Sequence, residues 1–243
     1  MIKPNMLKPG SRIGVVSPSY WFEEQNLIKT VGYFKEKGYS MVMGNSNSLE
    51  WGPFAGQPQE RADDIHRMFS DRDIDAIVCA RGGYGANRVL PLLDYDLIRD
   101  NPKIFMGFSD ITAYLTSITQ KTGLVTFHSP MLVSFKKRFV NYNFCTMEQV
   151  LSGEPDLKIE YPKSLSPKIL KPGFATGPLW GGNMTLLINR LGTSDHMDTD
   201  GVILFIEDLN EYLYAFERML VHMRTAGMLN KIAGLIIGEL YEF

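Results

Sequence analysis

The sequence predicts an α/β fold, with a doubly wound parallel sheet in the N-terminal part and a smaller α/β unit after it. Over the first 130 residues, short apolar runs alternate with amphipathic segments, the pattern typical of strand–helix repeats around a parallel sheet. Across residues 155–178, five prolines and sparse periodicity then indicate a linker. The chain has 243 residues, 44% of them hydrophobic, enough to form a packed core. We therefore predict two domains, at residues 1–160 and 161–243.

The N-terminal elements follow from two different periodicities. Ile13–Val16 is a continuous apolar run, typical of a strand buried on both faces. Residues 58–70 instead repeat apolar side chains at helical spacing, which predicts a helix with Ala62, Ile65 and Met68 facing inward. By the same criteria we predict strands at 13–16, 41–43, 75–80, 103–107 and 124–127. We predict helices at 23–37, 58–70, from 86 through Leu93, and at 111–121. The inward face of the helix at 23–37 is expected to include Ile28.

The second unit is predicted to begin near Gly177 and to alternate in the same way. It contains a helix around Leu186–Leu191, a strand at 202–206, a helix at 211–226 whose inward face includes Tyr212, and a last strand at 235–238.

Composition and charge argue against several classes of protein. The net charge is −2 and the charges are interspersed, so we expect no nucleic-acid partner, and we interpret the short basic cluster Lys136–Arg138 as a solvated loop. No apolar run approaches the ~20 residues of a membrane helix, and the N-terminus lacks the core of a signal peptide. Only Cys79 and Cys145 are cysteines, which fits a reducing compartment, so we expect a cytoplasmic protein. Without spaced His/Cys clusters, we expect no metal.

Ser109 is the first candidate for chemistry. An apolar strand runs into Gly107–Asp110 and an amphipathic helix follows at once. A serine on such a turn projects its hydroxyl beyond the end of a sheet, beside free backbone N–H groups, which suits acyl transfer. Ile111 stands where Gly-x-Ser-x-Gly requires glycine, so a plain helix N-cap is the alternative.

Two further loops should lie near the same edge of a sheet. The glycines of Arg81–Gly85 follow a strand and could point N–H groups at a phosphate or an oxyanion, or form only a tight turn. Glu207 and Asp208 follow the strand 202–206, where an acid could orient a histidine, or simply end the strand or cap the next helix.

The histidines and one tryptophan complete the set of candidates. His128 ends the strand after the helix of Ser109, so a Ser109–His128 dyad is conceivable, although a pocket-lining or structural role is the stronger interpretation. His66 is expected at the surface of its amphipathic helix, His196 lies in a polar loop, and His222 neighbours no other candidate in sequence. Trp180 could form a pocket wall with Asn183 as a polar contact, or pack in the core.

Five motifs occur together in one order along the chain. They are Ile13–Ser19, Cys79–Gly85, Gly107–Asp110, Gly177–Asn183 and Leu204–Asp208. This set resembles the LD-carboxypeptidase family of serine peptidases, which also holds the microcin-C-immunity peptidases. The Arg-Gly-Gly-Tyr-Gly form of residues 81–85 looks more like the murein-recycling branch.

The resemblance implies a Ser-Glu-His triad, in which Ser109 matches the nucleophile and Glu207 the acid. It implies that the backbone N–H groups of Gly83 and Asp110 form the oxyanion hole. It further implies an N-terminal domain like class I glutamine amidotransferases and removal of a terminal D-alanine from cytoplasmic muropeptides. No metal or cofactor is expected, and such enzymes are commonly homodimers.

The sequence departs from the family at the third triad member. The family histidine lies in a Gly-His motif beyond the region that matches Leu235–Glu239, and none of the four histidines here matches it. We therefore expect this chain, as given, to be impaired or inactive. Two alternatives stay open: a peptidase that cleaves aminoacyl-nucleotide toxins, with Trp180 as a base-stacking residue, and a non-catalytic muropeptide-binding protein.

Overall fold

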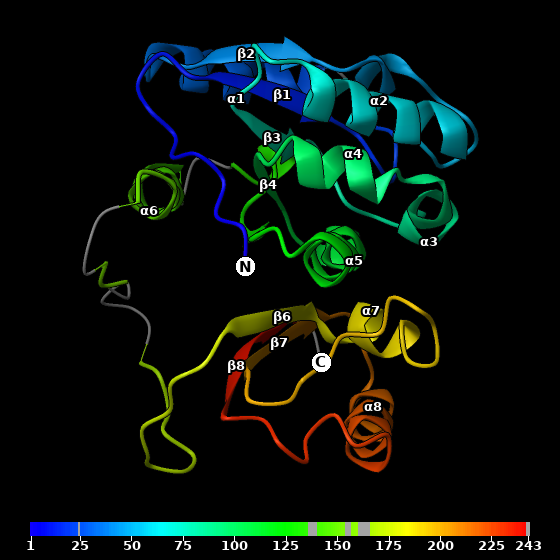
Figure 1. Cartoon of the computed structure of the whole chain (residues 1–243), viewed down its shortest axis with the longest axis vertical. Helices are drawn as coiled ribbons and strands as arrows, with labels where there is room; N and C mark the ends of the chain where they lie inside the picture. Colours follow the sequence, from blue (N-terminus) through cyan, green and yellow to red (C-terminus); the bar gives the residue numbers. More distant parts are fainter. Residues whose placement is uncertain (24, 136–139, 154–156, 160–165, 242–243) are drawn as a thin grey trace.

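The computed structural model contains two parallel sheets, one in each half of the chain (Figure 1), which confirms the predicted fold class. It describes residues 1–23, 25–135, 140–153, 157–159 and 166–241. The predicted loop Lys136–Arg138 and the predicted boundary between residues 160 and 161 lie outside these ranges.

The first sheet has the strand order β2-β1-β3-β4-β5, and every neighbouring pair is parallel. Because the chain leaves β1 toward one side and returns to β3 on the other, the order reverses between β1 and β3. In open α/β sheets, ligands bind beyond the carboxyl ends of the strands at such a switch point. The elements of this unit are β1 (Arg12–Val16), α1 (Gln25–Glu36), β2 (Ser40–Met43), α2 (Pro58–Ser70), β3 (Ala76–Cys79), α3 (Ala86–Val89), α4 (Tyr95–Asp100), β4 (Ile104–Gly107), α5 (Thr112–Thr122), β5 (Phe127–His128) and α6 (Val140–Leu151).

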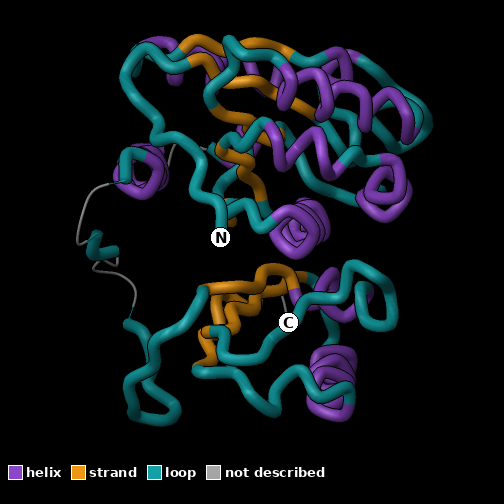
Figure 2. The backbone as a smooth tube through the Cα atoms, viewed as in Figure 1, coloured by secondary structure: helices purple, strands orange, loops and turns teal. Residues whose placement is uncertain are grey.

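Helices cover both faces of the first sheet (Figure 2). On one face, α1 and α6 contribute Phe34 and Phe144 to a core with Val15. On the other, α2, α4 and α5 pack on a core that includes Ile77 and Phe105. Since neighbouring residues of a strand point to opposite faces, covering both faces explains why the central strands are apolar at every position.

The second sheet has the order β6-β7-β8, again parallel. Leu204 and Ile206 of β7 are buried in a core with Met184 and Met223 of the two helices of this unit. By alternation, Phe205 and the residues in phase with it lie on the opposite face of β7. The elements are β6 (Leu179–Asn183), α7 (Met184–Asn189), β7 (Ile203–Leu209), α8 (Leu213–Thr225) and β8 (Gly234–Tyr241).

Two N-terminal predictions were wrong in detail, and one helix was not predicted. The single helix expected through Leu93 is split into α3, a 3₁₀ turn at Leu90–Leu92 and α4. Pro91 lies in that turn and lacks the N–H that a continuous helix needs. The fifth strand is shorter than expected, because Leu124 bridges to Ile2 instead of β4. The sequence also gave no prediction of α6.

The remaining differences from the prediction concern where two strands of the second unit end and which side chains face inward. Strands β7 and β8 are longer than predicted, with an irregularity in their pairing between Ile206 and Asp208. The predicted inward positions Tyr212 and Ile28 are instead exposed, at 73% and 66% of their surface. Ile28 follows the buried Leu27, and Tyr212 is the N-cap residue just before α8, so both lie at the margin of an apolar face, where hydrophobic periodicity does not separate inside from outside.

A buried carboxylate joins the two units. Asp195 of the second unit forms ion pairs with Lys121 of α5 (2.6 Å) and with Arg190 (2.7 Å). Arg190 also donates to Asn87 of α3, and Asn87 donates to Asn189 of α7. Helix α5 meanwhile contacts β6 and α7 directly. The two sheets are thus held by packing around α5 and by one ionic cluster beside it.

We predict that Asp195→Ala destabilises the protein by about 2–4 kcal/mol, because it leaves two cations without their buried partner. Asp200→Ala is the matched control. It breaks an ion pair with Lys231 whose side chains are both largely exposed, so its effect on stability should be small, because solvent screens an exposed pair. Urea denaturation of both variants measures the difference, and equal losses would contradict a structural role for the Asp195 cluster.

Candidate active site at the ends of β4 and β7

Ser109 lies on a tight turn between β4 and α5. Its φ is +61°, an uncommon value for a residue other than glycine and one that often occurs at functional turns. Its side chain caps neither the following 3₁₀ turn nor α5, so the N-cap interpretation is wrong. The residue is half-exposed, and its hydroxyl makes no hydrogen bond within the described residues. The turn therefore presents a free hydroxyl at the carboxyl edge of the first sheet.

The next residue, Asp110, points inward. Its buried carboxylate accepts hydrogen bonds from Ser19 Oγ (2.5 Å), in the loop after β1, and from the backbone N–H of Ala86 (3.0 Å), after β3. Burial raises the pKa of Asp110, and these bonds together with the nearby Arg61 guanidinium oppose the rise. One carboxylate therefore fixes the loops that follow β1, β3 and β4.

A buried arginine reinforces two of these loops, those after β1 and β3. Arg61 of α2 is fully buried and donates from Nη1 to the carbonyls of Pro18 (2.8 Å) and Gly85 (3.3 Å). The Tyr114 hydroxyl donates to the Pro18 carbonyl as well (2.8 Å). Burial lowers the pKa of Arg61, and nearby Tyr114 and Asp110 raise it. The sequence analysis missed this cluster, although Arg61 occupies an inward position of α2, one helical turn before Ile65.

The glycine loop after β3 lies directly beside Ser109. A Cβ at Gly82 would lie 3.3 Å from Ser109 Cβ, and one at Gly83 would lie 2.5 Å from the Tyr20 ring. Gly83 also has a φ of +113°, which favours glycine. The backbone N–H groups of Gly83 and Asp110 donate to no other described residue. Two unused donors thus flank the turn of the free hydroxyl.

Glu207 lies near the end of β7, on the face opposite the core of the second unit. Its Oε1 is buried and has no hydrogen-bond partner among the described residues. Burial, reinforced by the charge of Asp208, raises the pKa of Glu207 to about 7. Asp208 points the other way, where it accepts from Asn183 Nδ2 (2.8 Å) and from the backbone N–H of Thr185 (2.9 Å). The two acids therefore differ: Asp208 supports α7, and Glu207 has unused bonding capacity.

Ring contacts connect the face of Glu207 with the ends of β4 and β5. Phe205 shares that face and packs edge-on against His128, with ring centroids 5.1 Å apart. His128 in turn lies 6.1 Å from the Phe108 ring, next to Ser109. The structure thus brings together the elements that carry Ser109, His128 and Glu207.

A cavity of about 440 Å³ adjoins this junction. His128 and Trp180 line it, whereas Ser109, Glu207 and Asn183 do not, and Trp180 also packs against the core of the second unit. His128 is open to this cavity but surrounded by protein on its other sides, and burial lowers its pKa to about 4. Asn183 is buried, bonded to Asp208 and capping α7 through Leu186.

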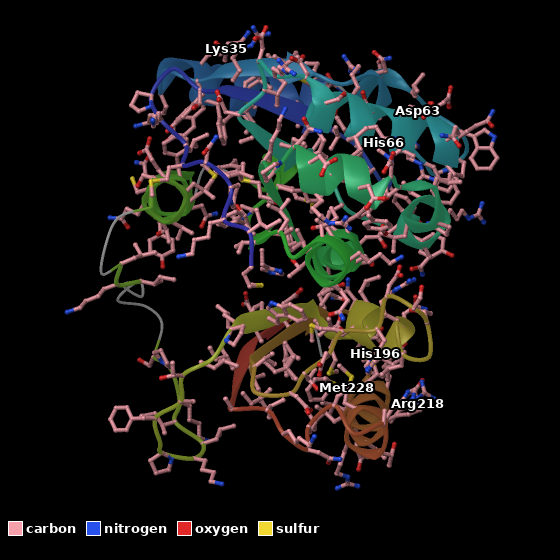
Figure 3. The ribbon with its side chains drawn as sticks, in the orientation of Figure 1. Lys35, Asp63, His66, His196, Arg218 and Met228 are labelled. Carbon is pink, nitrogen blue, oxygen red and sulfur yellow. The ribbon has the colours of Figure 1, made fainter. Side chains whose placement is uncertain are left out.

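The remaining histidines lie on other elements (Figure 3). His66, on α2, accepts a hydrogen bond from the backbone N–H of Asp94, and His196 follows α7. His222 is exposed on α8. None of the four histidines bonds to Ser109 or Glu207 in the part of the chain described here. Within that same part, no group of three His, Cys, Asp or Glu residues could hold a metal ion, and no helix has the length and apolar character to cross a membrane.

Both units match models of a known family. Residues 13–129 match the LD-carboxypeptidase N-terminal domain, and residues 176–243 match the LD-carboxypeptidase C-terminal domain. The chain belongs to the LD-carboxypeptidase family. A probable murein peptide carboxypeptidase of Bacillus subtilis is 38% identical over 99% of this chain and 75% of its own length.

Solved structures of LD-carboxypeptidase relatives share the arrangement of both units. A MccF-like protein from Bacillus anthracis superposes with a TM-score of 0.90 at 30% identity, covering 99% of this chain and 81% of that one. The muramoyltetrapeptide carboxypeptidase from Oxalobacter formigenes gives 0.85 at 27% identity, covering 96% and 78%. The chain is therefore a peptidase-family protein.

We predict that the raised pKa of Glu207 makes folding stability depend on pH. Because the folded state binds the proton more tightly, this contribution is full below the ordinary carboxyl pKa of about 4.5 and is lost as the pH rises toward about 7. Solvent at this half-buried site screens the effect to roughly 1 kcal/mol. Glu207→Gln should therefore be more stable than the parent at pH 8 by about that amount, with no gain at pH 4.5. Denaturant titration at both pH values measures this, and Glu239→Gln serves as a control. A pH-independent difference would contradict the assignment.

Proposed function

We propose that this chain is a serine LD-carboxypeptidase-type hydrolase that removes a terminal D-amino acid from muropeptides. The observation that carries the proposal is the strained Ser109 turn, which presents a free hydroxyl between the unused N–H groups of Gly83 and Asp110. An acyl-transfer site needs this combination of a nucleophile and donors for the developing oxyanion.

In the proposed reaction, Ser109 Oγ attacks the carbonyl carbon of the last peptide bond. Its proton passes to a base, and the carbonyl oxygen becomes an oxyanion held by the N–H groups of Gly83 and Asp110. Collapse of this intermediate breaks the C–N bond, and the terminal amino acid leaves as an amine after taking up the proton. Water then hydrolyses the acyl-serine ester and regenerates the hydroxyl.

Glu207 is proposed as the acid of the triad, whose role is to orient and stabilise a protonated imidazole. Its unpartnered, buried Oε1 supports this, because that oxygen has the free lone pairs an imidazole N–H requires. No described imidazole takes that place, so we propose that the 243-residue chain turns over slowly. Loss of one triad member typically costs on the order of 10⁴–10⁶ in rate.

Substrate contacts are proposed for His128 and Trp180, and a supporting role for Asn183, which holds the end of β6 against α5. His128 and Trp180 line the cavity beside the ends of β4, β5 and β7. Its apolar wall and the imidazole of His128 suit the side chains and the backbone of a bound peptide. Asn183 is proposed to act through its backbone position next to Thr112, whose Oγ1 accepts its N–H. The murein substrate class is supported by the 38% identical relative and by the muramoyltetrapeptide enzyme of similar structure.

A microcin-immunity type of peptidase is the second candidate, supported by the MccF-like structure and by an aromatic residue, Trp180, in the cavity wall. A non-catalytic muropeptide-binding protein is the third. Location in the cytoplasm and assembly as a homodimer are further predictions from the family. Cell fractionation tests the first, and sedimentation tests the second.

We expect the chain to bind a muramoyl tetrapeptide in calorimetry and to release D-alanine from it slowly, as detected by mass spectrometry. A fluorophosphonate probe should label the chain slowly, and Ser109→Ala should abolish labelling. Ser152→Ala, which changes a partly exposed serine just after α6, is the control.

Three outcomes distinguish the candidates. Rapid labelling of Ser109 would contradict the proposed impairment. Binding without any turnover favours the binding protein, and cleavage of an aminoacyl sulfamoyl adenosine without muropeptide binding favours the immunity type.

A further inference from the structure

An aromatic surface lies beyond the carboxyl ends of β1, β2 and β3, outside the site described above. Tyr20 follows β1, Trp51 and Phe54 follow β2, and Tyr84 follows β3. We call these four residues the aromatic shelf. Their rings form a connected series: Phe54 lies 6.0 Å from Tyr20, 5.8 Å from Trp51 and 6.1 Å from Tyr84. Phe54 is buried, whereas Trp51 and Tyr84 are 44% and 51% exposed.

The shelf is continuous with the proposed oxyanion loop. The Tyr20 ring occupies the space beside Gly83, where even a methyl group would clash, and the Tyr20 N–H donates to the Gly82 carbonyl (3.2 Å). The shelf also lies at the point where the strand order reverses, which is where this type of sheet binds ligands.

The shelf is rigid before any ligand binds. Trp51 and Phe54 exchange two backbone hydrogen bonds across a tight turn (2.8 and 3.1 Å). The Pro53 carbonyl accepts from the N–H of Trp21, and the Ser19 carbonyl from that of Ala55. Because these bonds fix the backbone that carries Trp51 and Phe54, binding there orders little additional backbone.

Arginines give the shelf a positive character. Arg88 lies 5.0 Å from the Phe54 ring and is exposed, and Arg81 lies 5.6 Å from the Tyr20 ring. Arg61 lies on the Phe54 ring from within the protein, at 5.1 Å. The protein as a whole has a net charge of −2. A local group of cations beside exposed rings therefore favours a ligand with apolar faces and carboxylates.

We propose that the aromatic shelf binds the muramoyl saccharide end of the substrate. This inference rests on the proposed function. In a muramoyl tetrapeptide that loses its last residue, three residues separate the cleaved bond from the sugar. Extended, they span roughly 10 Å, and the two ring contacts from Tyr20 through Phe54 to Trp51 are 6.0 and 5.8 Å long. Because the Tyr20 end of the shelf lies beside Gly83 and the glycine loop lies beside Ser109, the proposal directs the sugar of a bound peptide along the shelf toward Trp51 and Tyr84, where the C–H faces of the ring stack on the aromatic surface.

Calorimetry with two ligands, a muramoyl tetrapeptide and the free tetrapeptide, tests the proposal on the 243-residue chain with Ser109→Ala as background. We expect the muramoyl ligand to bind more tightly. Trp51→Ala should weaken muramoyl binding by about 3- to 10-fold and leave the free tetrapeptide unchanged. Trp51→Phe should restore most of the loss. Tyr214→Ala removes a comparably exposed ring on α8 and should change neither affinity, and thermal melting confirms that each variant folds.

The outcomes separate this inference from the proposed function. If both ligands bind equally and Trp51→Ala weakens neither, the shelf does not bind saccharide, although the peptide site stands. If Trp51→Ala weakens both ligands equally, the shelf binds peptide, and the saccharide assignment is overturned. If neither ligand binds, the proposed function fails and the shelf assignment fails with it.

Discussion

The buried carboxylate of Asp110 is the interaction on which the candidate site depends. A carboxylate excluded from water is strongly unfavourable unless it is hydrogen-bonded. Asp110 meets that requirement chiefly with Ser19 from one loop and the Ala86 N–H from another. Because Asp110 immediately follows Ser109, satisfying its carboxylate also sets the turn that carries the hydroxyl. The glycine loop is held by the same anion, through the residue that follows Gly85.

The two units contribute differently to the site. The first unit supplies the Ser109 turn and the glycine loop, which are joined by buried bonds through Arg61 and Asp110, and Arg61 also packs on the Phe54 ring of the aromatic shelf. The second unit supplies Glu207 on a strand whose position depends on packing against α5 and on the ion pairs of Asp195. The geometry between hydroxyl and acid is therefore determined by the interface between the units, far from either residue in sequence.

Local patterns predicted most of the fold, and long-range contacts account for what they missed. The apolar runs at β1 and β3 are unambiguous because both faces are buried, and the Ser109 turn follows from its position between a strand and a helix. The Arg61 cluster could not be predicted, since its partners are carbonyls of Pro18 and Gly85, whose positions depend on the tertiary fold. The sequence likewise could not separate the two acids at the end of β7. Only the burial of each, and the bonds of Asp208 to the start of α7, show that Glu207 is the one left without a partner.

The electrostatics of the junction argue that His128 is not the base for Ser109. A general base works best with a pKa near the working pH, and surrounding protein lowers that of His128 to about 4, with no anion acting to stabilise its charge. The pKa of Glu207 is shifted in the other direction. Burial and Asp208 raise its pKa to about 7, and no cation opposes that rise. An imidazolium placed against Glu207 Oε1 would lower the pKa of the carboxyl group and raise its own pKa. Each charge would therefore stabilise the other. The surroundings of the Glu207 carboxylate therefore suit an imidazole other than that of His128, whose ring packs against Phe205.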